Sequence, residues 1–204
     1  NPNGYGAIAS GDSSLAIGHS TQETAAGATA IGGAQNDSIP GANASGVHAT
    51  AIGGQTVASG AASLALGSNL EGYSGANATG EKAIAVGAAA TASGAQSVVV
   101  GTNSSATGTA GIAMGRNVIN QGNDAQAIGN SASVRSNYGT ALGTFATVAA
   151  NADRGIAIGN SNQSSTATTV KVADGIALGS YSVADRGAGI SGYNMTANRA
   201  NPYV

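Results

Sequence analysis

Small, apolar and glycine residues recur along this chain in one five-residue word. Its positions are a small residue, a variable residue, Ala in all copies but one, a bulky aliphatic residue and Gly, as in SLAIG at 14–18. Eleven copies end at Gly18, Gly32, Gly53, Gly67, Gly87, Gly101, Gly115, Gly129, Gly143, Gly159 and Gly179. A word that returns at a fixed period indicates a repeat architecture rather than an ordinary globular fold.

The spacing of these glycines predicts stacked turns with occasional loops. The residue numbers of successive glycines differ by 14 in six of the ten steps, and by 14 plus an insertion of 7, 6, 2 or 6 in the other four. Irregular insertions into a fixed period are expected where loops leave a stacked rung. The long insertions are predicted within 33–48, 68–82 and 160–174.

Each rung is expected to hold two short parallel strands. Side chains alternate between the faces of a strand, so positions two and four of the word share one face and the small first and third positions share the other. A weaker half-rung, half a period long, follows each word, and glycine at the corners permits the positive φ of a sharp turn. Five-residue strands are predicted, and Met114, which fills the slot held elsewhere by Ile, Leu or Val, is expected to lie in the core.

One domain is predicted for the whole chain, 1–204, with regular rungs over about 7–192. The segment 1–13 reads as a degenerate terminal rung with Ile8 in the bulky slot. The segment 180–204 reads as a closing segment, in which Ile190 takes the bulky slot and Ser191 the glycine slot. Terminal repeats are commonly atypical because they cap the stack.

Composition predicts association between chains. A roll of Ala, Ser, Gly and one aliphatic residue per rung has little interior, while ordering each residue costs on the order of 1–2 kcal/mol. The chain contains 33 glycines and only 3% aromatic residues. The small face repeated in every rung is therefore expected to receive a second chain in a homo-oligomer with closed symmetry.

Charge and cysteine content exclude several functions. The net charge is −2, only 8% of residues are charged and no basic run occurs, which argues against nucleic-acid binding. No apolar stretch is long enough for a membrane-spanning helix, which needs roughly 18 residues or more. Cysteine is absent, which suits a surface protein that crosses an oxidising compartment.

No catalytic, cofactor or metal site is predicted. His19 and His48 are expected to be exposed loop residues, because neither cysteines nor clustered carboxylates accompany them. Acidic residues are scattered singly, and calcium-binding glycine–aspartate repeats need one in every repeat. The glycines precede no predicted helix, so they match neither phosphate-loop nor dinucleotide fingerprints. We therefore expect no enzymatic activity.

The repeats resemble a known family. SLAIGHST, ATAIGG, SVVVGTNS and GIAIGNSN are similar to the head repeats of YadA-like trimeric autotransporter adhesins, whose motif is Asn-Ser-Val-Ala-Ile-Gly, two residues, then Ser. The best copy runs from Gln96 to Ser104; it lacks the leading Asn and has Val99 in place of the central Ala. The resemblance implies a left-handed parallel β-roll, associated as a parallel homotrimer.

The same resemblance implies a function and a location. It implies an exposed head of an outer-membrane-anchored protein on the bacterial cell surface, with a role in adhesion and virulence. Its partners would be host extracellular-matrix proteins of the collagen, fibronectin or laminin class, or host cell receptors. The regular rungs would serve fibrous ligands and the inserted loops would serve globular receptors.

Two other classes remain open as alternatives. A structural or ice-binding solenoid would need Thr in register on every rung, and position two of the word varies. A hexapeptide acyltransferase would have a period of six, hence roughly 18 residues per turn, whereas the dominant step here is shorter. Under the adhesin interpretation, the candidate ligand-contact residues are Tyr73, Glu81, Lys82, Asn103 and Ser104.

Overall fold

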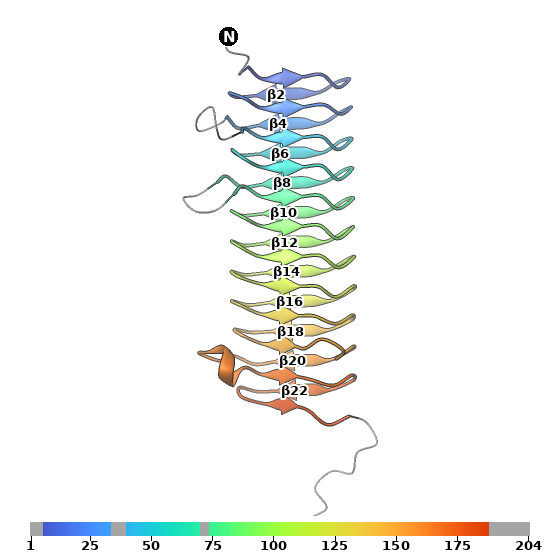
Figure 1. The fold of residues 1–204 in the computed structure, drawn as a ribbon, viewed down its shortest axis with the longest axis vertical. Helices are drawn as coiled ribbons and strands as arrows, with labels where there is room; N and C mark the ends of the chain where they lie inside the picture. Colours follow the sequence, from blue (N-terminus) through green and yellow to red (C-terminus); the bar gives the residue numbers. More distant parts are fainter. Residues whose placement is uncertain (1–5, 34–39, 70–73, 188–204) are drawn as a thin grey trace, which may run out of the picture.

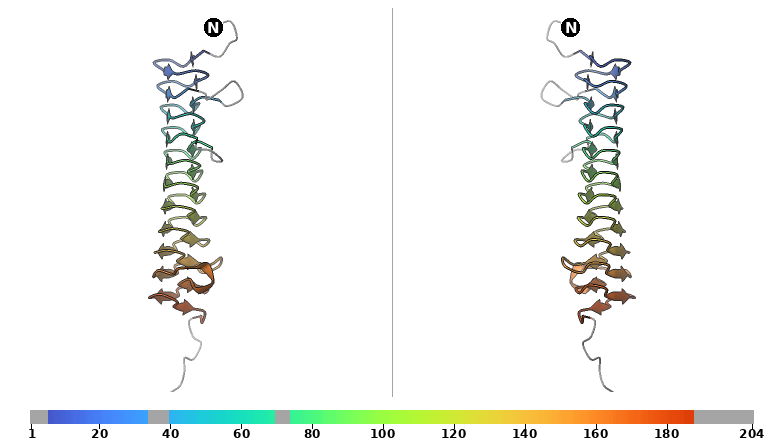
Figure 2. Two further views of the ribbon diagram at one scale, coloured as in Figure 1. Left: turned by 90° about the vertical axis from the view of Figure 1, so that its left-hand side faces the viewer. Right: turned by 90° about the vertical axis from the view of Figure 1, so that its right-hand side faces the viewer.

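The chain forms a narrow column of parallel rungs. A computed structural model describes residues 6–33, 40–69 and 74–187, in which two parallel sheets run the length of the molecule (Figure 1). Each turn of chain contributes one strand to each sheet, and the turns stack one above the next (Figure 2). The prediction of a parallel β-solenoid with one turn for each repeat word is therefore confirmed.

We call the first sheet the word sheet, because each of its strands covers positions two to four of a repeat word. Neighbouring strands keep the same register, so Ile84, Ala85 and Val86 pair with Val98, Val99 and Val100. Its eleven strands are β2 (Leu15–Ile17), β4 (Thr29–Ile31), β6 (Thr50–Ile52), β8 (Leu64–Leu66), β10 (Ile84–Val86), β12 (Val98–Val100), β14 (Ile112–Met114), β16 (Gln126–Ile128), β18 (Thr140–Leu142), β20 (Ile156–Ile158) and β22 (Ile176–Leu178).

The second sheet, which we call the return sheet, is built of two-residue strands. Its twelve strands are β1 (Ile8–Ala9), β3 (Gln22–Glu23), β5 (Asn43–Ala44), β7 (Val57–Ala58), β9 (Asn77–Ala78), β11 (Thr91–Ala92), β13 (Ser105–Ala106), β15 (Ile119–Asn120), β17 (Ser133–Val134), β19 (Thr147–Val148), β21 (Thr169–Val170) and β23 (Val183–Ala184). The prediction of five-residue strands was wrong, because the two corners of each turn take up the remaining residues.

Alanine fills the space between the sheets. Ala85 in the word sheet and Ala92 in the return sheet are fully buried, as are their equivalents in most rungs. The predicted role of the small face was therefore wrong: it lines the interior of one chain and is closed to a second. Its residues let the two sheets approach closely, and the small first residue of each word serves the same purpose.

The bulky aliphatic residues point outward. Met114, predicted as a core residue, is 40% exposed, and Ile17 and Leu178 are 52% and 70% exposed. The core prediction for Met114 was wrong because so short a turn brings its two sheets too close for long side chains to fit between them. The outer surface of the word sheet, which we call the apolar face, consequently carries a stripe of aliphatic residues: Leu15, Ile17, Leu66, Ile84, Val100, Met114, Leu142, Ile176 and Leu178.

The N-terminal end begins in the return sheet. Ile8 pairs with Gln22 of β3, so it does not occupy the bulky slot of a word as predicted. Glu23, the partner of Ala9, is fully buried and its carboxylate accepts hydrogen bonds from the backbone N–H groups of Ala25 (2.6 Å) and Gly11 (3.3 Å). At the other end, the expected slots of Ile190 and Ser191 lie outside the described residues.

The three long insertions all leave the roll at the corner that follows the word glycine, which we call the first corner. The chain rejoins the stack at Pro40 and Ser74, whose carbonyls accept hydrogen bonds from Gln55 N–H (3.2 Å) and Ala89 N–H (2.8 Å). Gly41–His48 and Gly75–Lys82 therefore belong to the rungs, and each of these insertions lies in the first part of the segment in which it was predicted. The third insertion contains the 3-10 helix η1 (Ser164–Thr166), seen beside the stack in Figure 1.

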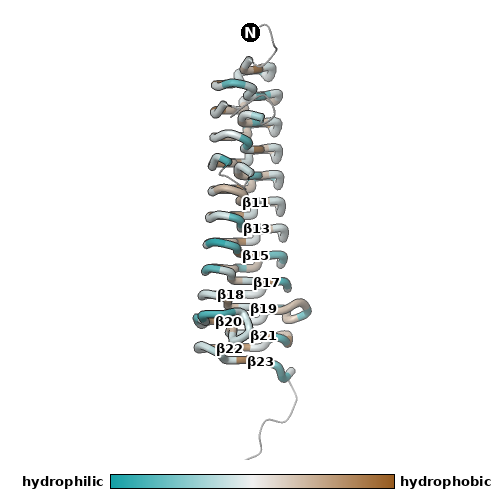
Figure 3. The backbone as a smooth tube through the Cα atoms, turned by 60° about the vertical axis from the view of Figure 1, so that its left-hand side comes forward, coloured by the Kyte–Doolittle hydropathy of each residue, from teal (hydrophilic) through white to brown (hydrophobic). Residues whose placement is uncertain are grey.

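The two outer surfaces differ in polarity. The first residue of each return strand points outward, and most of these residues are Asn, Thr, Ser or Gln. In Figure 3 the strands are mostly pale or brown, and the strongest hydrophilic colouring lies at the corners. The outward side chains of the word sheet are thus mainly aliphatic, and those of the return sheet are mainly polar. Within the described ranges, no helix is long and apolar enough to cross a bilayer.

Candidate functional site

The outer surface of the return sheet is the candidate binding surface, and we call it the polar face. Each return strand presents its first side chain outward while its second is turned to the interior, as Thr91 and buried Ala92 show. The outward positions stack in register, so Asn77, Thr91 and Ser105 form a column. Strands in a sheet lie about 4.8 Å apart, and a polar group therefore recurs at that interval.

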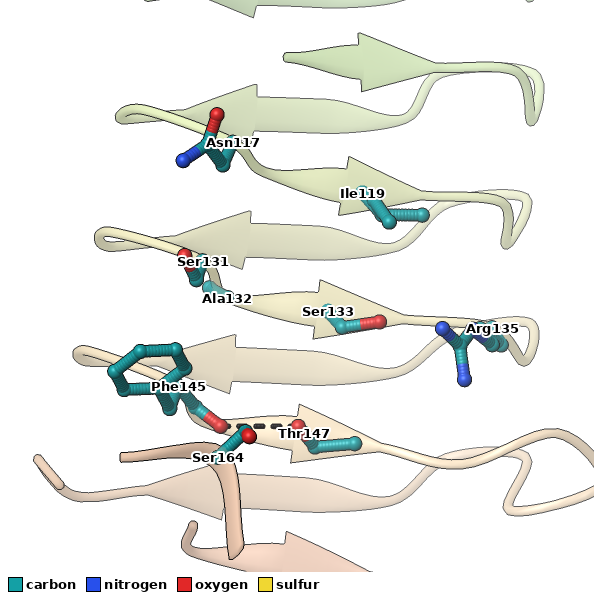
Figure 4. Close-up of a pocket in the computed structure, with 9 residues that line it drawn as sticks. All are labelled: Asn117, Ile119, Ser131, Ala132, Ser133, Arg135, Phe145, Thr147 and Ser164. Carbon is teal, nitrogen blue, oxygen red and sulfur yellow. Dashed lines mark hydrogen bonds between the residues drawn. The ribbon is translucent and has the colours of Figure 1, made fainter. Parts of the chain in front are cut away.

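A groove interrupts this regular surface between β11 and β19. It consists of two adjoining hollows of about 310 and 340 Å³, which share Asn117 and Ile119. The larger hollow is shown in Figure 4, with its lining side chains drawn as sticks. Those side chains come from Asn117, Ile119, Ser131, Ala132, Ser133, Arg135, Phe145, Thr147 and Ser164.

The groove exists because the outward column changes size at this point. Ser133 stands between Ile119 and Thr147 in register, so a short side chain is flanked by two longer ones. On one side the wall is raised by Phe145, at the first corner, and by Ser164 of η1 (Figure 4). Thr147 Oγ1 donates a hydrogen bond to the Phe145 carbonyl (2.9 Å), which fixes the corner beside the ring.

Asparagines reinforce the first corner next to the groove. Asn103 and Asn117 both adopt left-handed backbone conformations, with φ of 56° and 58°. Asparagine tolerates this region better than most non-glycine residues. Asn103 Nδ2 donates to Asn117 Oδ1 (2.9 Å), so the two side chains join successive rungs.

A similar ladder runs along the corner that precedes each word, which we call the second corner. Asn123 Oδ1 accepts from Thr109 N–H (2.8 Å), Asn137 Oδ1 accepts from Asn123 N–H (3.0 Å), and Asp153 Oδ1 accepts from Asn137 N–H (3.0 Å). These bonds satisfy backbone donors that the turn would otherwise leave to water, and they hold the rungs in register.

The predicted ligand-contact residues do not form one site. Asn103 lines the groove, whereas Glu81 and Lys82 lie at the second corner. Tyr73 lies outside the described residues. Ser104 is only 1% exposed: its hydroxyl donates to the Gly115 carbonyl (2.6 Å) and accepts from Val118 N–H (3.0 Å). Ser104 also lines the smaller hollow, but its hydroxyl is already bonded within the roll, so its role as a ligand contact stays a prediction.

Two ion pairs lie at the second corner. Lys82 Nζ lies 2.8 Å from Glu81 Oε1, and Arg154 binds Asp174 through two hydrogen bonds of 2.6 and 2.8 Å. The hydrogen bond and charge of Lys82 lower the pKa of Glu81, and Glu81 raises the pKa of Lys82. The hydrogen bond from Arg154 likewise lowers the pKa of Asp174. These exposed pairs stabilise the corner weakly, because solvent screens them.

Arg135, on the polar face, differs from these basic residues. Its guanidinium has no carboxylate partner within the part of the chain that the structure describes. The residues at the same position of the neighbouring rungs are Gln121 and Ala149, which are uncharged. Arg135 therefore presents a positive charge at the edge of the groove that no carboxylate of the described residues neutralises.

The histidines lie where they were expected. His19 and His48 are both exposed and lie at different corners. Among the described residues, no three His, Cys, Asp or Glu side chains are close enough to share a metal ion.

Sequence reasoning missed the residues that shape the groove. Arg135 and Phe145 differ from the residues at the same positions of the adjacent rungs, which are Gln121 and Ala149 for Arg135 and Ser131 for Phe145, and Phe145 is the one phenylalanine of the chain. Departures of this kind from a repeat are a signal that could have been used. Arg135 and Phe145 lie on neighbouring turns. The half-rungs share too weak a sequence pattern for these two positions to be aligned from the sequence.

Comparison with known proteins identifies the repeats. The family described as the YadA head domain repeat (two copies) matches residues 3–21, 9–34, 44–69, 78–104 and 92–117. Among solved structures, the chain is similar to the collagen-binding domain of the Yersinia adhesin YadA. The two are 30% identical, the match covers 72% of this chain and 67% of that chain, and the TM-score is 0.47. No curated protein sequence matches the chain.

The matched repeats define the class of protein: the chain belongs to the YadA-like head domains. Membership of this family points to a structural or binding role.

Proposed function

We propose that this chain is the exposed head of a bacterial cell-surface adhesin anchored in the outer membrane. Its ligands are host extracellular-matrix proteins, of the collagen, fibronectin or laminin class, or host cell receptors. The main support is the run of YadA head repeats, together with the sequence identity to the Yersinia domain, which is described as collagen-binding. The polar face supplies a surface suited to that role.

A repetitive polar surface suits a fibrous ligand. The same outward position recurs on every rung, so a ligand with its own repeat can contact several rungs at once. Many weak contacts of this kind raise the overall affinity through effective concentration. The insertions at the first corner break the repeat and can carry specificity for individual receptors, as loops on rigid scaffolds often do.

We infer further that three copies associate in parallel as left-handed rolls about a common axis. The apolar face supports this assembly, because it is a continuous aliphatic stripe that extends over the whole column. Soluble monomers rarely expose large contiguous apolar patches. Three such faces meeting at a threefold axis would bury the stripe and leave each polar face in solvent.

Two lysine substitutions test the assembly. Met114→Lys places a charge on the apolar face, whereas Thr91→Lys places the same charge on the polar face. In sedimentation equilibrium, the wild type and Thr91→Lys should have three times the mass of the 19.2-kDa chain. Met114→Lys should dissociate and keep its β-sheet circular dichroism spectrum. A wild-type protein that is monomeric at every concentration would contradict the trimer.

Matrix binding is tested with the intact trimer on immobilised collagen, fibronectin and laminin. The double variant Thr91→Glu and Ser105→Glu adds charge to the polar face and should weaken binding to the preferred protein. The matched control is Ala61→Glu with Gln96→Glu, which adds the same charge at the second corner. Absence of binding to all three proteins and to host cells would favour a purely structural solenoid. An equal loss of binding in both double variants would show that the polar face is not the binding surface.

A further inference from the structure

We propose that the groove over Ser133 binds a sugar that carries an anionic group, as found on the glycans of host cell surfaces. This inference rests on the proposed adhesin function and names a ligand class for one part of the polar face. It concerns a single position on the column, whereas binding to matrix fibres would use the repeat.

The shape of the groove is the first support. The larger hollow has a volume of about 340 Å³, which falls within the range of small-ligand sites. Phe145 is at the first corner and Arg135 follows β17, so they stand on opposite sides of Ser133 (Figure 4). Four residue positions separate their columns, which corresponds to at most about 13 Å. A short oligosaccharide can span that distance.

The lining chemistry suits an anionic sugar. The half-buried ring of Phe145 offers an apolar surface on which the C–H face of a pyranose can rest. Asn117, Ser131 and Thr147 supply amide and hydroxyl groups that can bond to sugar hydroxyls. Arg135 presents a guanidinium, which binds carboxylates and other oxyanions through paired hydrogen bonds.

Two groups in the groove lack partners among the residues that the structure describes. Ser133 is 8% exposed, and its buried Oγ has no hydrogen-bond partner in the structure. Its hydroxyl points along the strand toward Arg135 (Figure 4). Arg135 lacks a carboxylate partner among the described residues. Buried hydroxyls are usually hydrogen-bonded, so the unpaired Ser133 beside the unpaired Arg135 indicates that the described residues do not complete this site by themselves.

A peptide strand fits the groove less well. Peptides that add to a sheet bind the free backbone groups of an edge strand. The groove lies on the face of the sheet, where Ser133 N–H donates to Ala146 C=O and Thr147 N–H donates to Thr168 C=O, both at 2.9 Å. The backbone is thus already paired, and side-chain hydroxyls, an amide, a ring and a cation remain for recognition.

The groove also stays accessible in the proposed trimer. Ser133, Phe145 and Arg135 lie on or beside the return sheet, and the apolar face lies on the outer surface of the word sheet. The two outer surfaces point in opposite directions. Burial of the apolar face between copies therefore leaves the groove exposed to solvent.

The test is a calorimetric titration of the trimeric head with sialyllactose, sulfated lactose and neutral lactose. We expect at least one of the two anionic sugars to bind more tightly than lactose, and the comparison shows whether a carboxylate or a sulfate is preferred. Arg135→Gln, which copies Gln121 of the preceding rung, should weaken that binding at least tenfold. Phe145→Ser, which copies Ser131, should weaken both anionic and neutral sugars.

Arg116→Gln is the matched control, because it removes the same charge from an exposed corner residue that does not line the groove. Circular dichroism and sedimentation confirm that each variant keeps its fold and assembly. The proposal is overturned if no anionic sugar binds at millimolar concentration, if lactose binds equally well, or if Arg135→Gln and Arg116→Gln behave alike. Matrix-protein binding measured on the same samples separates this failure from failure of the adhesin function.

Discussion

The side chain of Val134 fills the space that a side chain on Gly139 would need in the interior of the roll. A Cβ atom on Gly139 would lie 2.7 Å from Val134 Cγ1 and 3.2 Å from Val148 Cγ1. Gly139 does not have a positive φ, so glycine is required at this position because it has no side chain and not because of its backbone conformation. The same pairing recurs at Val148 with Gly155 and at Val170 with Gly175, whereas β9 and β11, which end in Ala78 and Ala92, are followed by words that begin with Ala83 and Ser97.

Because the two positions compete for one space, substitutions at Val134 and Gly139 should have non-additive effects on the free energy of unfolding. Gly139→Ala should destabilise the head by about 1–3 kcal/mol through overpacking. Val134→Ala should also destabilise it by leaving a cavity, and the double variant should lose less stability than the two losses together. Urea unfolding at one fixed protein concentration measures the free energies. Simple additivity of the two substitutions would show that the side chains do not compete for space.

The glycine at the end of a word is required by the backbone. Gly115 has a φ of 131°, and a Cβ atom there would lie 2.6 Å from the carbonyl oxygen of Gly129. Gly115→Val should destabilise the protein by roughly 1–3 kcal/mol. Gly187, which has open space around it, provides the control, and Gly187→Val should leave the melting temperature unchanged. Equal melting temperatures for the two variants would contradict the steric argument.

Replacing the residue before a word with asparagine should stabilise the protein. Ala62 and Ala110 hold left-handed backbone conformations at φ of 54° and 52°, and the position corresponds to the leading Asn of the family motif. Left-handed geometry strains alanine more than asparagine, so Ala62→Asn should stabilise the protein by up to about 1 kcal/mol. Ala61→Asn, at the exposed neighbouring residue without positive φ, should give no gain. Thermal melting of both variants decides the question.

Two buried serines should respond to alanine in opposite ways. Ser97 Oγ is buried without a hydrogen-bond partner, whereas Ser104 Oγ bonds to both Gly115 and Val118. Ser97→Ala should stabilise the head by about 1 kcal/mol, and Ser104→Ala should destabilise it by about 1–3 kcal/mol, because it leaves buried backbone groups unpaired. Chemical denaturation compares the two variants directly. Destabilisation by Ser97→Ala would mean that its hydroxyl has a partner, such as a bound water.

The repeat word predicted the rungs because it contains their main physical constraints. Gly101 and Gly115 mark corners with positive φ, and the interval between them is the length of one turn. The alternation of large and small residues correctly separated two faces. It could not show which face is internal, because the usual rule that large aliphatic residues are buried fails when two sheets are this close.

The groove could not be predicted from the sequence, because its residues come together only through the pairing of the return strands. Ser133, Arg135 and Phe145 come from two neighbouring turns, and their proximity depends on the alignment of the return strands. Those strands are only two residues long and share no strong pattern. The wrong assignment of Ile8 has the same origin, since this residue lies in the half-rung that the sequence marks weakly.

The identical register of successive turns makes the height of the column adjustable. Between Gly87 and Gly143, the glycine-ended words follow one another at one constant step, and each strand meets the next at equivalent positions. Loss or duplication of one repeat unit by recombination would therefore join two turns that already fit. Each event would change the height of the column by about 4.8 Å, while the residues of the polar face and those of the apolar face keep their alignment.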